Sequence, residues 1–341
     1  MFVKSIMKHI LVTGGAGYLG YHVSSKLLSS GYKVRILDNL SFGKSALDNL
    51  KKKFKFDFVK GDIRDLRTVL NSMEGIDAII HLAGIVGDPA SKIDPTKSTE
   101  INYLSTKLLV DSAMYFKIKQ FIFASTCSVY GASNNQNLNE LSTLNPLSLY
   151  AETKLKSEKI ILNSSNKYIS PTIFRTGTLF GYSERMRFDL VINLFIGQSL
   201  SQHEITIEGG NQWRPFIHVE DAARAYLLAL EKTPTKIKGI FNLGGDDLNF
   251  QLNDIGKLVS QKIIPTRIKY SKIEDKRNYR VSFKKINHSM NFEPKRTVSY
   301  AIDEIKNAVK KGKIKNWKNP IYYNNKFPLV GRNKSSKYYW Q

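Results

Sequence analysis

Apolar runs of strand length recur through the first half of the chain, separated by longer segments in which apolar residues repeat with the 3.6-residue period of an amphipathic helix. The strand-like runs are residues 9–12, 33–37, 54–60, 77–82, 119–125 and 168–175, and the clearest helical segments are residues 98–116 and 149–163. Strands that alternate with helices are joined by right-handed crossovers, so the strands pair in parallel and helices cover both faces of the sheet. The pattern predicts an α/β fold with a doubly wound parallel sheet.

After Arg175 the alternation becomes less regular. A helical segment, a short strand-like run and a return to strand–helix order follow, at residues 188–196, 204–208, 216–230 and 240–243. We expect a smaller mixed α/β lobe that binds substrate, with a ligand cleft between the lobes at the carboxyl ends of the strands. The expected boundaries are residues 1–180 for the first domain, completed by about 216–250, then 181–215 and 251–325 for the smaller lobe, and 326–341 for a C-terminal tail.

A glycine motif lies between the first strand-like run and the first helical segment, at Gly14, Gly17 and Gly20. The first glycine allows a sharp turn, the second lets backbone amides approach a pyrophosphate, and the third lets the helix pack closely on the strand. The N-terminus of the helix then faces the phosphates, where unpaired amide groups and the helix dipole favour negative charge. In this position the motif predicts a dinucleotide-binding domain of the Rossmann type, rather than a glycine turn without a ligand.

Carboxylates follow the second and third strand-like runs. Asp38 stands where a carboxylate can accept hydrogen bonds from both hydroxyls of the adenosine ribose and would repel a 2′-phosphate, which favours NAD over NADP. Asp62 is placed to reach the adenine amino group, whereas Asp65 is expected to cap the next helix. Asn102, near the start of the helical segment 98–116, either braces the chain beside the cofactor or is a polar residue on a helix face.

Length and composition narrow the class of protein. The chain of 341 residues is long enough for a sizeable core, and 42% of its residues are apolar. Its apolar runs are shorter than a membrane span, and residues 1–8 lack the long apolar core of a signal peptide. The single cysteine, Cys127, excludes an intrachain disulfide. These features predict a cytoplasmic protein without a membrane partner, and no bound metal is expected.

The formal net charge of +23 allows two interpretations, a nucleic-acid binder or a solvated basic surface on an enzyme with an anionic substrate. Basic residues are spread over the whole chain, with a local excess at residues 51–53 and between Lys306 and Lys318. The sequence has no basic strand interleaved with aromatic residues, of the kind that stacks bases. The spread favours the solvated surface, and no nucleic acid is expected as a partner.

Side chains with a catalytic spacing follow the fifth strand-like run. Tyr150 and Lys154 are four residues apart in a helical segment, so both project from one face of the helix. A phenol is a poor base at neutral pH, but an ammonium group and a cationic nicotinamide nearby both favour the phenolate. Tyr150 could therefore take a proton from a sugar hydroxyl while hydride leaves for the cofactor. Thr126, directly after the strand-like run, would hydrogen-bond the same oxygen.

These motifs occur in an order that resembles the extended short-chain dehydrogenase/reductase family, in particular its NAD-dependent nucleotide-sugar epimerases and dehydratases, typified by UDP-glucose 4-epimerase. The similarity runs from about His9 to Pro294 and includes residues 13–20, 38–41, 61–63, 81–84, 125–131, 150–154 and 213–221. The resemblance implies a homodimer in which Thr126, Tyr150 and Lys154 are catalytic. The residues that it implies in NAD binding are Gly14, Gly17, Tyr18, Leu19, Asp38, Asn39, Asp62, Ile63, Leu82, Ala83, Gly84, Asn102, Ser125, Tyr150 and Lys154.

The resemblance also implies contacts to a nucleotide-diphosphate sugar. The family's arginine in the motif at 213–221 corresponds to Arg214, and a second basic contact from the smaller lobe corresponds to Arg277 or Arg280. For each arginine a surface salt bridge is the alternative. Thr178 stands where the family's epimerases have an asparagine that faces the sugar. His218, in the same motif as Arg214, is expected to be structural.

Two positions depart from the pattern of the family's 4,6-dehydratases. Those enzymes carry an Asp-Glu pair directly after the catalytic threonine, where this chain has Cys127 and Ser128. Neither residue supplies the acid and base that loss of water requires, so a dehydratase is not expected. Cys127 is either an acid/base for epimerisation at C3 or C5 or a buried thiol without a catalytic role, and its spacing from Tyr130 favours the second.

The predicted function is an NAD-dependent nucleotide-sugar epimerase that oxidises the sugar at C4 to a 4-keto intermediate and then returns the hydride. A C4 dehydrogenase or a 4-keto reductase of the same family is the alternative among enzymes. A non-catalytic NAD- or RNA-binding protein of this fold is the alternative outside enzymes. Tyr150 and Lys154 argue against it, because such proteins usually lose both.

Overall fold

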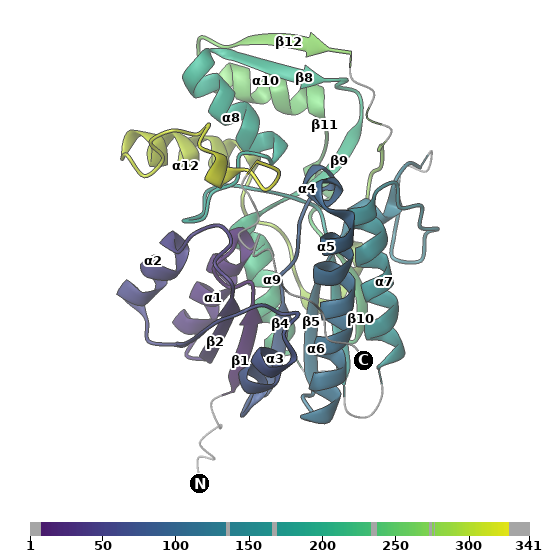
Figure 1. Ribbon diagram of the computed structural model, residues 1–341. Helices are drawn as coiled ribbons and strands as arrows, with labels where there is room; N and C mark the ends of the chain where they lie inside the picture. The colour runs from purple at the N-terminus through teal and green to yellow at the C-terminus, as the bar shows by residue number, and fades with distance from the viewer. Residues whose placement is uncertain are drawn as a thin grey trace.

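A parallel sheet of seven strands forms the centre of the larger part of the molecule (Figure 1). The computed structural model describes residues 8–133, 137–165, 169–232, 237–272, 275 and 277–326. The strands lie in the order β10-β6-β5-β4-β1-β2-β3, and all neighbours pair in parallel. Their bounds are β1 His9–Thr13, β2 Lys33–Asp38, β3 Asp57–Lys60, β4 Ala78–His81, β5 Gln120–Thr126, β6 Ser170–Thr176 and β10 Gly239–Leu243. The strand order reverses beside β1, which confirms the predicted doubly wound sheet.

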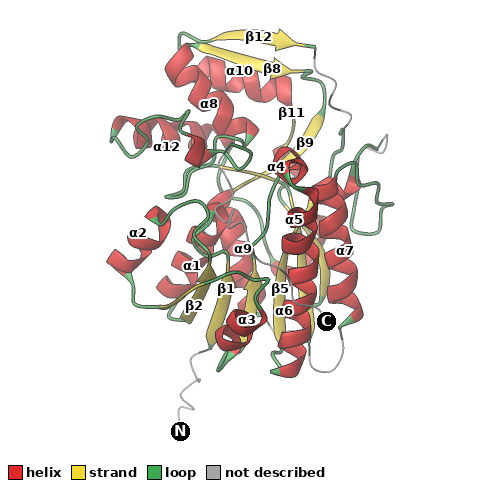
Figure 2. Cartoon of the chain, in the orientation of Figure 1, coloured by secondary structure: helices red, strands yellow, loops and turns green. Residues whose placement is uncertain are grey.

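Helices cover both faces of this sheet because its central strands are apolar on both sides (Figure 2). In β1, Ile10 and Val12 pack into one apolar cluster and Leu11 into another on the opposite face. The helices of the first cluster are α1 Tyr18–Ser29, α2 Ser45–Lys53 and α9 Val219–Glu231. Those of the second are α3 Leu66–Met73, α6 Ser105–Tyr115 and α7 Leu149–Asn163.

A smaller lobe with its own apolar core lies at the top of Figure 1. It combines a two-stranded parallel sheet, β8-β12, with three helices, and a three-stranded sheet, β11-β9-β7, lies below it. The bounds are β7 Thr178–Phe180, β8 Glu204–Glu208, β9 Trp213–His218, β11 Asn249–Gln251, β12 Arg267–Ser271, α8 Val191–Gln202, α10 Leu252–Lys262 and α12 Val298–Lys310. The shorter elements are α4 Asp88–Ile93, α5 Pro95–Thr99, η1 Glu100–Leu104, η2 Cys127–Tyr130, η3 Asp246–Leu248, α11 Lys284–Met290 and η4 Pro320–Tyr322.

The helical segment predicted at residues 98–116 is confirmed to Tyr115, but the helix is not regular, because a π-helical stretch, η1, separates α5 from α6. The stretch contains Asn102, whose backbone carbonyl accepts hydrogen bonds from the hydroxyls of Thr106 and Ser157. Hydroxyl donors of this kind compete with the regular backbone ladder of a helix. The widened turn is therefore held by contacts that helical periodicity does not encode.

Three other predicted elements differ in their bounds or place. The strand expected at 54–60 begins only at Asp57, since Phe54 closes α2 by donating its amide to Leu50. The helix expected at 188–196 begins only at Val191, because the Phe188 amide donates to the Tyr322 carbonyl at 2.9 Å and holds the chain in a loop. The strand expected in the segment 216–230 is β9, and it belongs to the three-stranded sheet rather than to the large one.

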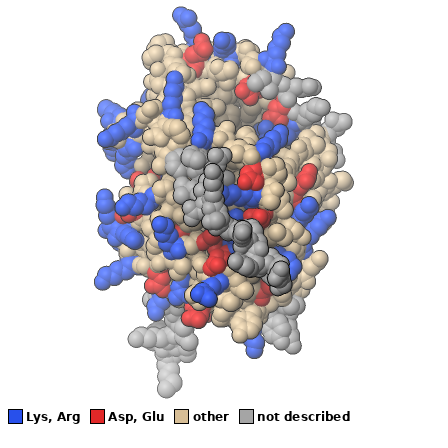
Figure 3. All heavy atoms as spheres, in the orientation of Figure 1, with Lys and Arg blue, Asp and Glu red and all other residues tan. Residues whose placement is uncertain are grey.

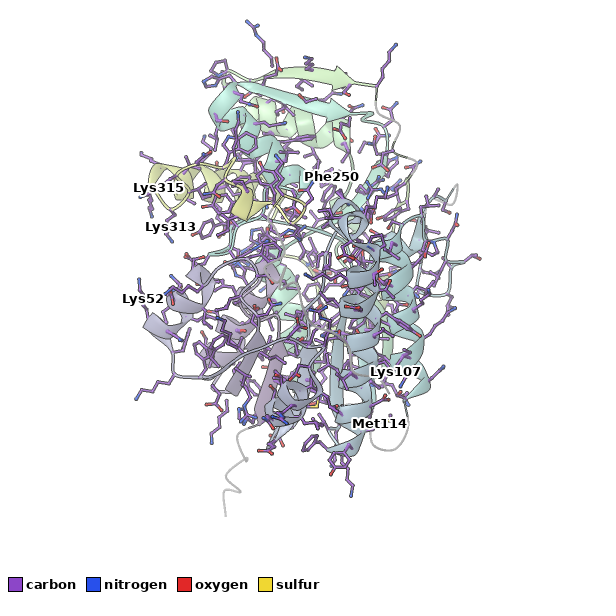
Figure 4. All side chains as sticks on the ribbon, in the orientation of Figure 1. Lys52, Lys107, Met114, Phe250, Lys313 and Lys315 are labelled. Carbon is purple, nitrogen blue, oxygen red and sulfur yellow. The ribbon has the colours of Figure 1, made fainter. Side chains whose placement is uncertain are left out.

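Lysine and arginine side chains are dispersed over the face in Figure 3, with acidic side chains among them. Lys52 on α2 and Lys107 on α6, both exposed and labelled in Figure 4, lie on separate parts of the surface. Residues 1–7, Tyr168 and residues 327–341, which the sequence analysis used, lie outside the described residues. Within the described part of the chain, every helix is too short or too polar to span a membrane.

Candidate active site

A cavity of about 710 Å³ lies at the carboxyl ends of the strands of the large sheet, between that sheet and the smaller lobe. Its walls come from the glycine turn after β1, the segments after β2 to β6, helix α7, and residues 185–190 and 323–326. Of the residues predicted to contact the cofactor, all except Asn102 line it. The position agrees with the rule that ligands of doubly wound folds bind outside the carboxyl ends of the strands.

The glycine turn forms a close backbone cradle at one end of this cavity. Gly14 has a φ of 73°, and a Cβ there would lie 2.7 Å from the backbone nitrogen of Ala83. A Cβ on Gly20 would collide with the carbonyl oxygen of Gly14, so the third glycine is needed for the close start of α1. Gly17 caps this helix without a side-chain hydrogen bond. The first turn of α1 therefore presents a helix N-terminus suited to phosphate oxygens.

Asp38 lies at the end of β2, on the wall of the cavity. Its Oδ2 accepts a hydrogen bond from the Ala16 amide at 3.0 Å, and its Oδ1 accepts one from the Leu40 amide at 2.8 Å. Burial raises the pKa of the carboxyl, and the two backbone amides act in the opposite direction. The amides hold the carboxylate in one orientation at the place where the ribose contact is predicted.

Two further predicted residues have different surroundings. Asp62 lines the cavity and pairs with Arg64 at 2.9 Å. Asn102 does not line it: the side-chain amide accepts from the backbone nitrogen of Ile85 at 2.8 Å and donates to its carbonyl at 2.9 Å. Of the two alternatives for Asn102, the structure has the brace, which holds the chain directly after the cavity-lining Gly84.

The three residues predicted to be catalytic line one part of the cavity. Tyr150 and Lys154 lie one turn apart on α7, and the Thr126 side chain is close enough to Tyr150 to lower the pKa of its phenol. The Lys154 Nζ donates to the Ala124 carbonyl at 2.8 Å. Helix α7 begins at this wall because Ser148 caps it, with its Oγ accepting from the Ala151 amide at 3.3 Å. Helix and strand end together bring a phenol, a hydroxyl and an amine to one place.

Burial governs the protonation of this group. It raises the pKa of Tyr150 above its ordinary value, against the opposing effects of the Arg187 charge and the Thr126 side chain. It also lowers the pKa of Lys154 to about 8, although the Glu158 carboxylate acts in the opposite direction. The phenol is therefore neutral in this structure, and Arg187 is a cation near Tyr150 that the sequence analysis did not single out.

Several cavity-lining residues were missed by the sequence analysis, chiefly in the segment between β7 and α8. Arg187 forms a two-pronged ion pair with Asp189, at 3.0 and 2.8 Å. Arg185 lines the same wall, and Tyr279 approaches Ser128, with 3.4 Å between their hydroxyl oxygens. The available signal was the alternation of charged and apolar residues at 185–190, which the sequence analysis did not consider when it predicted a helix from residue 188.

The residues predicted to bind substrate are divided by the fold. Thr178 and Arg277 line the cavity, whereas Arg214 and Arg280 do not. Arg214 is turned toward Asp275, with which it pairs at 2.8 Å, and the Arg280 guanidinium packs over the Trp213 ring at 4.4 Å. The predicted phosphate contacts of these two arginines stay predictions.

Cys127 and His218 are both buried. The Cys127 Sγ donates to the Arg175 carbonyl at 3.1 Å, burial raises the pKa of the thiol, and Cys127 is not among the residues that line the cavity. This arrangement favours the buried thiol over the acid/base. His218 caps α9 and lies 3.1 Å from the Glu304 carboxylate, contacts that fit the structural role expected for it.

The cavity combines a glycine turn suited to a dinucleotide with a Tyr-Lys pair, and both lie on a doubly wound sheet. This combination is typical of the site of a nucleotide-dependent oxidoreductase. The family described as the NAD dependent epimerase/dehydratase family matches residues 10–244. The chain belongs to this family, as the resemblance noted from its motifs predicted.

Relatives of both reaction types are similar to this chain. It is 35% identical over 227 residues to a putative UDP-glucose 4-epimerase of Methanocaldococcus jannaschii, covering 65% of this chain and 73% of the relative. It is 32% identical over 281 residues to a dTDP-D-glucose 4,6-dehydratase of Dictyostelium discoideum, covering 76% of this chain and only 62% of the relative's length. The crystal structure of a UDP-glucuronic acid 4-epimerase from Bacillus cereus, in complex with UDP-glucuronic acid and NAD, superposes with a TM-score of 0.81 at 26% identity, over 89% of this chain and 99% of that one.

Proposed function

We propose that this protein is an NAD-dependent nucleotide-sugar epimerase that oxidises its substrate at C4 and returns the hydride to the 4-keto intermediate. The observation that carries the proposal is the position of Thr126, Tyr150 and Lys154 in the same cavity as the glycine cradle. The epimerases among the relatives support it. The two carboxylates of the family's dehydratases are replaced by Cys127 and Ser128, which also favours epimerisation over loss of water.

The residues of the cavity fit NAD. The cradle leaves no room for a side chain at Gly14 or Gly20, and two backbone amides hold Asp38 where we propose the ribose contact. Bound NAD would supply a hydride acceptor. We propose that residues 1–180 and 216–250 hold the cofactor and that 181–215 and 251–325 hold the sugar nucleotide.

The chain's own residues would handle the proton of the sugar hydroxyl. Tyr150, as phenolate, would accept the proton from the C4 oxygen, and Thr126, whose side chain lies near Tyr150, would donate to the same oxygen. Burial keeps the phenol neutral, so the phenolate needs a positive charge to be brought near it, as the predicted nicotinamide would do. Lys154, one turn along α7 from Tyr150, would add a positive charge that favours the phenolate and would help to position the bound groups.

Arg277 is the proposed contact to the nucleotide diphosphate. In this structure its guanidinium is held by Asp275, at 2.8 and 2.7 Å, and by Asp88 at 2.5 Å. A diphosphate that binds here would have to compete with these carboxylates. Thr178 lines the cavity where the resemblance implies a contact to the sugar.

The test is a panel of UDP-, TDP-, GDP- and CDP-sugars incubated with the purified protein and analysed by mass spectrometry and by NADH absorbance. An epimerase gives an isomer of unchanged mass, no net NADH, and NAD that stays bound through purification. A C4 dehydrogenase or 4-keto reductase, the alternative enzymes, gives a product that differs by two hydrogens together with a stoichiometric change in NADH. The absence of any product would favour the non-catalytic NAD- or RNA-binding alternative.

We further propose a homodimer in the cytoplasm that acts in carbohydrate biosynthesis. The resemblance supports the dimer, and the single cysteine fits a reducing compartment. Light scattering coupled to gel filtration tests the first statement, and fractionation of cells tests the second.

A further inference from the structure

Arg185 is a buried cation on the wall of the cavity for which the proposed mechanism has no use. Only 5% of its surface is exposed, and its guanidinium lies 3.9 Å from the centroid of the Phe42 ring. Its Nη2 donates to Asn324 at 2.6 Å, but among the described residues its Nε has no hydrogen-bond partner and no carboxylate forms an ion pair with it. Arg187, two residues on, is paired with Asp189.

Arg185 lies beside the start of α1. The segment that carries it is fastened to the first turn of that helix, because the Tyr18 hydroxyl donates to the Gly181 carbonyl at 2.6 Å and the Ser183 hydroxyl donates to the Tyr18 carbonyl at 2.9 Å. Phe42, under the guanidinium, belongs to the loop that follows Asp38. Helix N-terminus, Asp38 loop and Arg185 therefore surround one part of the cavity.

Within the described residues, no carboxylate forms an ion pair with the Arg185 guanidinium. Burial and the Arg187 charge lower the pKa of Arg185 to about 9, and the more distant Asp189 and Asp38 carboxylates only partly oppose them. The nearby Asp38 carboxylate already accepts two backbone hydrogen bonds. A helix N-terminus and a guanidinium together favour a ligand with more than one negative charge, which a pyrophosphate has and a ribose lacks.

We infer that Arg185 binds the pyrophosphate of the dinucleotide, together with the amides of the glycine cradle. The inference rests on the proposed binding of NAD. Stacking on Phe42 and the bond to Asn324 hold the planar guanidinium in place, so that it meets the pyrophosphate with little loss of side-chain freedom. Its consequence is a cofactor that dissociates slowly, as a reaction that returns its hydride to the same substrate requires.

The experiment compares the full-length protein with Arg185→Met, Arg185→Lys and a matched control, Arg224→Met. Arg224 also packs over an aromatic ring, at 4.5 Å from the Phe292 centroid, and also has a buried Nε without a hydrogen-bond partner, but it does not line the cavity. NAD per chain is measured after purification, and calorimetric titrations use NAD, ADP-ribose, UDP and adenosine. Melting temperatures are recorded without added ligand.

We expect Arg185→Met to bind NAD and ADP-ribose about 10- to 100-fold more weakly, as for loss of a charged hydrogen-bond partner, and to bind UDP and adenosine as the unchanged protein does. The Arg185→Lys variant should lose less affinity for NAD and ADP-ribose, and the Arg224→Met variant should bind both as the unchanged protein does. The unliganded Arg185→Met variant should melt no lower than the unchanged protein, because a desolvated charge has been removed.

Three results would overturn either the proposed function or the inference about Arg185. If the unchanged protein binds no NAD, the proposed function fails. If it binds NAD and Arg185→Met binds it equally well, with or without a lower melting temperature, the inference about Arg185 fails and the proposed function stands. If the loss falls on UDP instead of ADP-ribose, Arg185 serves the substrate's diphosphate and the inference is again overturned.

Discussion

Tyr150 is the residue on which turnover should depend most strongly. Replacing it with Phe removes the hydroxyl that accepts the proton but keeps the ring on the cavity wall, so we expect turnover to fall by at least about 100-fold while NAD binding is retained. Steady-state kinetics and an NAD titration measure the two effects. Tyr115→Phe is the control, because Tyr115 is exposed on α6, outside the cavity. Near-normal turnover of Tyr150→Phe would refute the assignment.

Asp38 should decide between NAD and NADP. A 2′-phosphate placed beside this partly buried carboxylate costs about 1–3 kcal/mol, so NADP should bind several-fold to some hundred-fold more weakly than NAD. Asp38→Asn removes the negative charge and should narrow the difference in affinity between NAD and NADP. Parallel titrations with both nucleotides measure it, and equal affinity in the unchanged protein would show that Asp38 does not select.

Lys154 should set the alkaline limit of the pH range in which kcat/KM is high. Its pKa is lowered to about 8, so its charge is lost as the pH rises through that value, and kcat/KM should fall there. Between this pKa and the ordinary value of 10.5 the unfolded chain binds a proton that the native state does not, so Lys154 makes the free energy of unfolding rise with pH in that window. Lys154→Arg keeps the charge and should move the fall in kcat/KM to higher pH. An unchanged pH profile would assign the fall to another group.

At the scale of elements, α7 is the helix that fixes the catalytic geometry. Ser148 caps its N-terminus and also donates to Asp88 at 2.6 Å, which links the helix to the first residue of α4. Loss of such a cap lowers the stability of a helix and shifts the start of its first turn, where Tyr150 lies.

We therefore expect Ser148→Ala to lower the free energy of unfolding by about 0.5–2 kcal/mol, as measured by urea denaturation. Ser164→Ala is the matched control, since Ser164 lies at the other end of the same helix and forms no N-terminal cap. Its effect should stay within about 0.5 kcal/mol. Equal effects of the two substitutions would argue against a special role of the cap.

At the scale of the whole molecule, a chain of polar contacts joins the smaller lobe to the catalytic helix. Arg277 donates to Asp88 at 2.5 Å, and Asp88 accepts from the cap residue Ser148. Because Arg277 is also the proposed diphosphate contact, substrate that draws it away from Asp88 would act on the junction between the lobes. The cavity is thus formed by both lobes together.

We expect that the protein does not catalyse loss of water. Dehydration needs a base for the C5 proton and an acid for the C6 hydroxyl. Cys127 is turned to the Arg175 carbonyl and burial raises the pKa of its thiol, while Ser128 offers only an alcohol. Mass spectrometry of NDP-hexoses incubated with the protein should show no product lighter by one water. Catalytic formation of that product would overturn the interpretation of both positions.

Local pattern determined the fold class and much of the site. Strand-like runs alternating with helical segments predicted the doubly wound sheet, because both periodicities come from burial of one face. The glycine motif and Asp38 predicted the cradle, because a turn and the end of a strand are local features. Tyr150 and Lys154 were predicted on one helix face from their spacing alone.

Only the tertiary structure decided which distant side chains meet at the cavity. Arg185, Arg187 and Tyr279 line it because the segments after β7 and before α11 fold over the ends of the large sheet. Arg214 and Arg280 do not line the cavity. Arg214 forms an ion pair with Asp275 instead, and Arg280 packs over the Trp213 ring. A charged side chain takes the partner that packing brings within reach, and that partner can stand anywhere in the sequence. For the same reason the π-helical stretch at Asn102, which depends on a hydroxyl from α7, has no signal in the periodicity of its own segment.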